Sequence, residues 1–136
     1  MSARRKARKR ALDILFEADM RVVNAADLLS QRPIAEISEA NYARTLVLGT
    51  CEHQAKIDEL INTYAEGWDM DRMPVIDRNL LRIALYEILW SAEVDDKIAV
   101  SEAVEMAQEL STKDSASYIN GVLGRVLVLK SVISLT

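Results

Sequence analysis

Apolar residues recur at helical intervals along almost the whole chain, and this spacing leaves little room for any other secondary structure. Near the N-terminus they follow the spacing i, i+4, i+7, i+8, i+11 and i+15, at Ala7, Ala11, Ile14, Leu15, Ala18 and Val22. This run predicts an amphipathic helix over residues 3–22. Only four Gly and two Pro occur in 136 residues, too few for a β-sandwich that turns about every ten residues. We therefore expect an all-α protein.

Two further helices are expected before the middle of the chain. Asn24 and Asp27 can open the first of them, and Pro33 closes it at the preceding residue. The next runs from about residue 38 to residue 64, with Gly49 as its weakest interior position. The polar stretch 62–73 then forms the only plausible boundary in the chain.

Three helices are expected after that boundary. The segment 74–91 begins with Pro74 and is apolar on nearly all sides, which indicates a central helix buried by its neighbours. Apolar residues from 100 to 110 predict the next helix. Asp114 or Ser115 can cap the last one.

The length of the chain allows one compact domain. We predict two small three-helix-bundle-like halves, residues 1–66 and 67–136, packed together with a basic N-terminal arm. No apolar run approaches the ~20 residues that span a membrane, so no membrane association is expected. Cys51 is the only cysteine, which excludes an internal disulfide and fits a reducing compartment. We therefore expect a cytoplasmic protein.

Charge is distributed very unevenly along the chain. The total is 17 Lys and Arg against 21 Asp and Glu, a net charge of −4. Residues 1–10 contain no acid and six bases, which are Arg4, Arg5, Lys6, Arg8, Lys9 and Arg10. The remaining residues carry a net charge of −10. Such an asymmetry favours a nucleic-acid-binding arm, although a solvated N-terminal end would have the same composition.

The residue inventory argues against an enzyme. The sole histidine, His53, lies two residues from Cys51, and this pair is too sparse for a closed zinc site. Packing or surface roles are expected for both, with no metal and no cofactor. Gly121 and Gly124 have the spacing of a KH-domain loop, but they lie within a helical pattern, which favours close helix packing. No set of residues forms a catalytic group.

The first helix carries a second apolar line. Leu12, Phe16 and Met20 are spaced by four residues and point away from the main apolar stripe. If this ridge is exposed, it provides a docking surface for a partner protein beside the basic arm. A second copy of the chain could cover the same ridge and form a homodimer. Alternatively, both lines belong to the core because the helix is enclosed.

A third candidate cluster, Lys113, Asp114 and Tyr118, lies at the start of the last helix. Free backbone N–H groups at a helix start attract anions, and a tyrosine ring can stack on a base. Asp114 is equally well explained as a helix cap.

Four segments of the sequence together resemble the NusB family of bacterial transcription antitermination factors. They are RRKAR at 4–8, LLRIALYE at 80–87, AVSEAVEMA at 99–107 and DSASYINGVL at 114–123. The resemblance covers most of the chain in order. Residues 24–66 resemble the family only in their helical character.

This resemblance implies an all-helical, non-enzymatic factor that pairs with NusE, a small-subunit ribosomal protein. The pair would bind the boxA element of nascent ribosomal RNA within an antitermination complex on RNA polymerase. The family's RNA-binding arm matches Arg4, Arg5, Lys6 and Arg8, which Lys9 and Arg10 extend by charge. Asp114 and Tyr118 match the RNA-contacting start of the last helix, where Phe is common in place of Tyr118.

The resemblance also locates a partner surface. Phe16, Met20 and Asp77 fall where the family contacts NusE, and Phe16 stands where Tyr is common.

If all six arm charges bind single-stranded RNA, log K against log[salt] should have a slope of about −4. The alternative function is a protein-interaction module whose arm binds acidic protein or ribosomal surfaces without reading RNA sequence.

Overall fold

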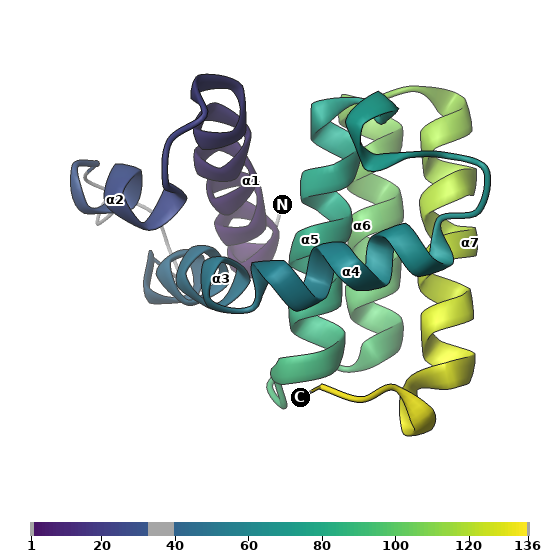
Figure 1. Ribbon diagram of the computed structural model, residues 1–136. Coiled ribbons are helices and arrows are strands. Elements are labelled where there is room, and N and C mark those ends of the chain that lie inside the picture. Colours follow the sequence, from purple (N-terminus) through teal and green to yellow (C-terminus); the bar gives the residue numbers. More distant parts are fainter. Residues whose placement is uncertain (1, 33–39, 136) are drawn as a thin grey trace.

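The computed structural model describes residues 2–32 and 40–135, and this part of the chain contains helices and no strand (Figure 1). Its α-helices are α1 (Ala3–Arg21), α2 (Ala25–Ser30), α3 (Ala40–Glu52), α4 (Gln54–Tyr64), α5 (Val75–Trp90), α6 (Asp96–Leu110) and α7 (Lys113–Leu129). Two short 3-10 helices are η1 (Met70–Arg72) and η2 (Lys130–Val132). The prediction of an all-α fold is confirmed.

Helix α5 is the centre of the molecule. It forms a three-helix bundle with α6 and α7, while α1 and α3 pack against another side of it (Figure 1). Helix α4 crosses over α5 and contacts α7 as well. This enclosure explains why α5 is apolar nearly all round, since every side meets another helix. Helices from both predicted halves therefore share α5 in one core.

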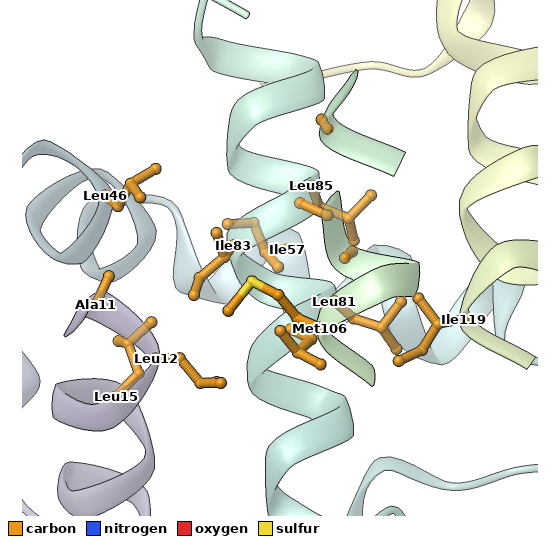
Figure 2. Close-up of a cluster of buried hydrophobic side chains, with 14 of the residues drawn as sticks. Ala11, Leu12, Leu15, Leu46, Ile57, Leu81, Ile83, Leu85, Met106 and Ile119 are labelled. Carbon is orange, nitrogen blue, oxygen red and sulfur yellow. The ribbon is translucent and has the colours of Figure 1, made fainter. Parts of the chain in front are cut away.

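The core brings together side chains from helices far apart in sequence (Figure 2). Leu46 of α3, Ile57 of α4 and Leu81 of α5 are fully buried. Met106 of α6 and Ile119 of α7 complete the same cluster. Burying each such side chain contributes about 1.5–3 kcal/mol, so α5 is held by contacts on several sides.

The helix expected over residues 38–64 is divided in two. Helix α3 ends at Glu52, and α4 starts at Gln54 after a break at His53. The His53 ring stacks on Trp90 of α5 with 4.3 Å between ring centroids, which confirms its packing role. Redirecting the chain here lets α4 cross α5. The predicted start near residue 38 lies outside the described residues.

Glycine is required where α3 meets α5. A Cβ atom on Gly49 would overlap the ring of Tyr86. The sequence predicts close helix packing at Gly121 and Gly124, and this prediction is wrong. A Cβ on Gly124 would meet no atom within 4 Å, and one on Gly121 would meet only a guanidinium at 3.9 Å. The close helix contact is therefore at Gly49, the position that looked merely weak in the sequence.

Side-chain caps mark the starts of α1, α2 and α7. Asn24 caps α2 as predicted, because its Oδ1 accepts a hydrogen bond from the Asp27 backbone N–H at 3.0 Å. For α7 the prediction of Asp114 or Ser115 is wrong. The cap is Thr112, whose Oγ1 accepts from the Ser115 N–H at 3.1 Å, so Asp114 lies inside the first turn.

Candidate nucleic-acid interface

The basic arm forms the first turns of α1 and lies against α5 and α6. Arg8 is the most buried of its bases, with 3% of the residue exposed. Its guanidinium donates to the Glu87 carboxylate at 3.0 and 2.9 Å and to Glu102 at 2.7 Å. Burial would lower the pKa of Arg8, but the hydrogen bonds and charge of Glu87 outweigh burial and raise it. Arg8 is therefore a charged anchor for α1.

Arg5 faces a line of acids on α6. Its guanidinium donates to both carboxylate oxygens of Glu102, and it lies 3.3 Å from Glu105 and 3.6 Å from Glu109. Hydrogen bonds from Arg5 lower the pKa of Glu102, although burial acts in the opposite direction. The Arg5 side chain is only 12% exposed. This arginine therefore bridges α1 to α6 in the same way as Arg8.

Arg4 is positioned by an aromatic ring. Its guanidinium carbon lies 4.3 Å from the ring centroid of Tyr42 on α3, and its Nη2 lies 3.6 Å from Glu93. The Tyr42 hydroxyl donates to the buried Glu87 carboxylate. Burial, reinforced by the charge of Glu87, raises the pKa of Tyr42. Tyr42 therefore connects exposed Arg4 to the buried pair of Arg8 and Glu87.

The other arm bases lie nearer the solvent. Lys6 is exposed and has no ion pair with any residue that the structure describes. Lys9 pairs at 2.7 Å with Asp13, and both side chains remain accessible. Arg10 is half-buried. Of the six bases that the sequence offers for RNA binding, Arg5 and Arg8 are already bound by acids from α5 and α6.

The candidate residues at the start of α7 differ in their exposure. Lys113 and Asp114 are exposed in the first turn, whereas Tyr118 is half-buried. The Tyr118 ring meets Trp68 edge-on, with centroids 4.6 Å apart, and its hydroxyl donates to the Glu66 carbonyl at 3.3 Å. Burial raises the pKa of this hydroxyl. The contacts with Trp68 and Glu66 therefore fix the orientation of the Tyr118 ring.

Asp77 supports the start of α7 from inside the protein. It lies in the first turn of α5 and is completely buried. Its two carboxylate oxygens accept hydrogen bonds of 2.5 Å each from the hydroxyls of Ser111 and Ser115. Sequence reasoning missed both serines, since nothing local connects them to a residue more than thirty positions away. Asp77 is therefore a buried link between helices.

A groove borders the start of α7. It lies between α6 and α7, has a volume of about 730 Å³, and is lined by Glu105 and Lys113 among others. Glu105 also contacts Arg5 at 3.3 Å. The arm and the start of α7 thus border the same side of α6, on either side of one carboxylate.

The second apolar line on α1 is only partly exposed. Leu12 is 3% exposed, so the prediction of an exposed ridge is wrong at this residue. Its side chain is buried because α1 packs against both α3 and α5. Phe16 is half-buried, and Met20 is 59% exposed. The accessible part of the line is therefore the C-terminal end of α1.

Other polar clusters in the described residues are internal supports. Asp19 accepts hydrogen bonds from Arg78 at 2.6 and 2.7 Å and from Arg82 at 3.1 Å, and Arg82 also binds Asp58. This cluster joins α1, α4 and α5. Residues 2–32 and 40–135 contain no grouping of side chains suited to a metal ion. Within the same ranges, no helix has the length and apolar character needed to cross a membrane.

The fold and these contacts define an all-helical protein whose basic arm on α1 is bound by acids of α5 and α6. Its sequence places it more narrowly. Residues 5–128 match the model of the NusB family. The transcription antitermination protein NusB of Kineococcus radiotolerans is 53% identical over 135 residues, covering 98% of this chain and 99% of the relative. The chain belongs to the NusB family.

Solved structures have the same fold. NusB of T. maritima is 30% identical, has a TM-score of 0.83, and matches 93% of this chain and 91% of its own. A crystal structure described as antitermination factors NusB and NusE in complex with dsRNA has a TM-score of 0.79. It matches 93% of this chain and 96% of its own. Because its sequence is only 24% identical, this second structure shows a shared fold and no more.

Proposed function

We propose that this chain is a non-enzymatic transcription antitermination factor that binds the boxA element of nascent ribosomal RNA together with NusE, within a complex on RNA polymerase. The observation that carries the proposal is the juxtaposition of the arm and the start of α7 on one side of α6. Relatives named transcription antitermination protein NusB support it, and one of them has a sequence 53% identical to this chain. The matched structure that contains NusB, NusE and RNA adds support from the fold.

In this proposal the accessible bases bind phosphates. Arg4, Lys6 and Lys9 lie on the arm, and Lys113 continues the positive charge at α7. Backbone N–H groups at the start of α7 favour anions, while the Asp114 carboxylate can accept from a base amino group. Tyr118 offers an aromatic face to an unstacked base. Phosphates supply affinity, and the start of α7 supplies sequence preference.

Arg5 and Arg8 have a different role. Because they are bound to acids, they hold α1 in place and contribute little to phosphate binding. If Arg4, Lys6, Lys9 and Lys113 each engage one phosphate, log K against log[salt] should have a slope of about −3. A slope near zero would exclude phosphate binding by the arm.

Two matched variants test the RNA surface. Lys6→Ala/Lys9→Ala should weaken RNA binding about tenfold or more at low salt, because two phosphate contacts are lost. The control, Lys56→Ala/Lys130→Ala, removes equal charge from residues that pair with Glu59 and Asp96 away from the arm. Equal losses in both variants would indicate that only net charge matters, as expected for a protein-interaction module without RNA specificity.

The proposed NusE surface is the C-terminal end of α1. Phe16 and Met20 supply apolar contacts there. Leu12 and Asp77, which are buried, act indirectly through the packing of α1 and the start of α7. Phe16→Asp should abolish NusE association in a pull-down or calorimetric titration while circular dichroism shows an intact fold. Wild-type affinity in this variant would remove Phe16 from the interface.

A further inference from the structure

Three glutamates on α6 form a line that faces the arm. Glu102, Glu105 and Glu109 are spaced by three and four residues, so they lie on one side of the helix. All three contact the guanidinium of Arg5. A single arginine of the arm is thus surrounded by three carboxylates.

These carboxylates differ in exposure. The Glu102 side chain is 14% exposed and binds Arg8 as well as Arg5, so it is a fixed part of the packing. Glu105 and Glu109 are 56% and 59% exposed, and they lie farther from Arg5, at 3.3 and 3.6 Å. Solvent-exposed ion pairs of this kind contribute little to stability and are easily exchanged. Glu105 and Glu109 are therefore dispensable for holding α1 in place.

Their position matters for RNA. A phosphate that approaches the arm beside Arg5 meets two negative charges well within the screening length of about 8 Å. Glu105 also lines the groove that contains Lys113, so it lies between the two elements proposed to bind RNA. Glu105 therefore opposes the ligand between its two contact regions, and Glu109 opposes it beside Arg5.

We propose that Glu105 and Glu109 occupy Arg5 as phosphate mimics and keep RNA phosphates away from it. This inference rests on the RNA-binding function proposed above. Their repulsion of phosphates lowers the affinity for every RNA, but an RNA that also makes base contacts at α7 compensates for it. The two glutamates therefore increase selectivity by weakening binding that depends on charge alone.

The test uses the full chain with Glu105 and Glu109 changed to Gln, which removes charge but preserves shape. The control variant is Glu52→Gln/Glu59→Gln, which makes the same change in net charge at side chains 76% and 64% exposed on α3 and α4. Fluorescence anisotropy would measure Kd for a boxA-type RNA and for a scrambled RNA at several salt concentrations. Circular dichroism would verify that both variants are folded.

For Glu105→Gln/Glu109→Gln we expect about tenfold tighter binding of the scrambled RNA, a smaller gain for the boxA-type RNA, and a salt slope steeper by about 0.7. The control should differ from wild type by less than twofold. If the two variants behave alike while wild type prefers boxA, the inference is wrong and the proposed function stands. If wild type binds neither RNA, the proposed function fails and the inference fails with it.

Discussion

Arg8 and Lys6 belong to the same basic arm, but their environments assign them opposite roles. Arg8 is buried with Glu87, of which 1% is exposed, whereas Lys6 faces solvent. Removing one partner of a buried ion pair leaves an uncompensated charge, which is far more costly than losing an exposed side chain. The charge count of the arm therefore overstates the number of bases that RNA can reach.

This contrast gives a prediction for single residues. Arg8→Met should lower the free energy of unfolding by about 3–5 kcal/mol, because Glu87 is left buried and unpaired. Lys6→Ala should leave it nearly unchanged but weaken RNA binding. Urea denaturation and RNA anisotropy on both variants measure the two effects. Comparable stability of the two variants would contradict the anchoring role of Arg8.

Two helical glycines provide a second test at this scale. Gly49→Ala should destabilise the protein by about 1–3 kcal/mol, since the new methyl group would overlap Tyr86. Gly124→Ala should stabilise it by about 0.5–1 kcal/mol, because no atom lies within 4 Å and alanine favours the helix. Urea denaturation of both variants would reveal the opposite signs. Effects of the same sign would show that the α3–α5 contact is looser than described.

At the scale of elements, acids on α5 and α6 determine how α1 is held. Glu87 comes from α5 and Glu102 from α6, and both bind Arg8. The start of α7 is held similarly, by Asp77 of α5. Helix α5 therefore supports both elements that are proposed to contact RNA.

The contact between α1 and α6 should make stability depend on pH. The pKa of Glu102 is below its ordinary value of 4.5 because Arg5 donates hydrogen bonds to it. A carboxyl group with a lowered folded-state pKa stabilises the protein above its unfolded pKa, and this stabilisation is lost as pH falls through the folded value. The free energy of unfolding should therefore decrease below about pH 5.

Glu102→Gln isolates this contribution. The variant should be less stable than wild type at pH 7 and should show a smaller decrease between pH 6 and pH 3, because the titrating group is absent. Urea denaturation at each pH provides the measurement. Glu17 and Asp19, whose pKa values are also lowered, retain part of the dependence in both proteins. Parallel curves for the two proteins would show that the contact of Glu102 with Arg5 contributes nothing.

For the whole molecule, the shared core predicts a single unfolding transition. Helix α5 contacts α1, α3 and α4 as well as α6 and α7, so the two predicted halves share one core. Trp68 and Trp90 report on residues 67–136, while far-UV circular dichroism reports on all helices. The two signals should give coincident thermal transitions. Separate midpoints would show that residues 1–66 unfold independently.

The sequence predicted what depends on local spacing. The periodicity of apolar residues located α1 and α5 to within a residue or two, and Asn24 marked a helix start correctly. The sequence did not predict pairings between residues that lie far apart along the chain. Arg8 and Glu87 are 79 positions apart, and no spacing rule connects them. Leu12 was assigned to an exposed ridge because a helical wheel does not reveal that α1 is covered on two sides.

The same limit applies to the interface. Its basic residues were evident from composition, but their accessibility depends on acids contributed by α5 and α6. The pairing of Asp77 with Ser111 and Ser115 likewise arises only when α5 and α7 meet. Composition therefore identified the arm, and the tertiary contacts divided it into anchors and accessible bases.

The most direct measurement is the affinity of the wild-type chain for a boxA-type RNA and for a scrambled RNA of equal length, each with and without NusE. We predict tighter binding of the boxA-type RNA by the chain alone and a larger preference when NusE is present. Equal affinity for the two RNAs under both conditions would contradict sequence-specific RNA binding by this protein.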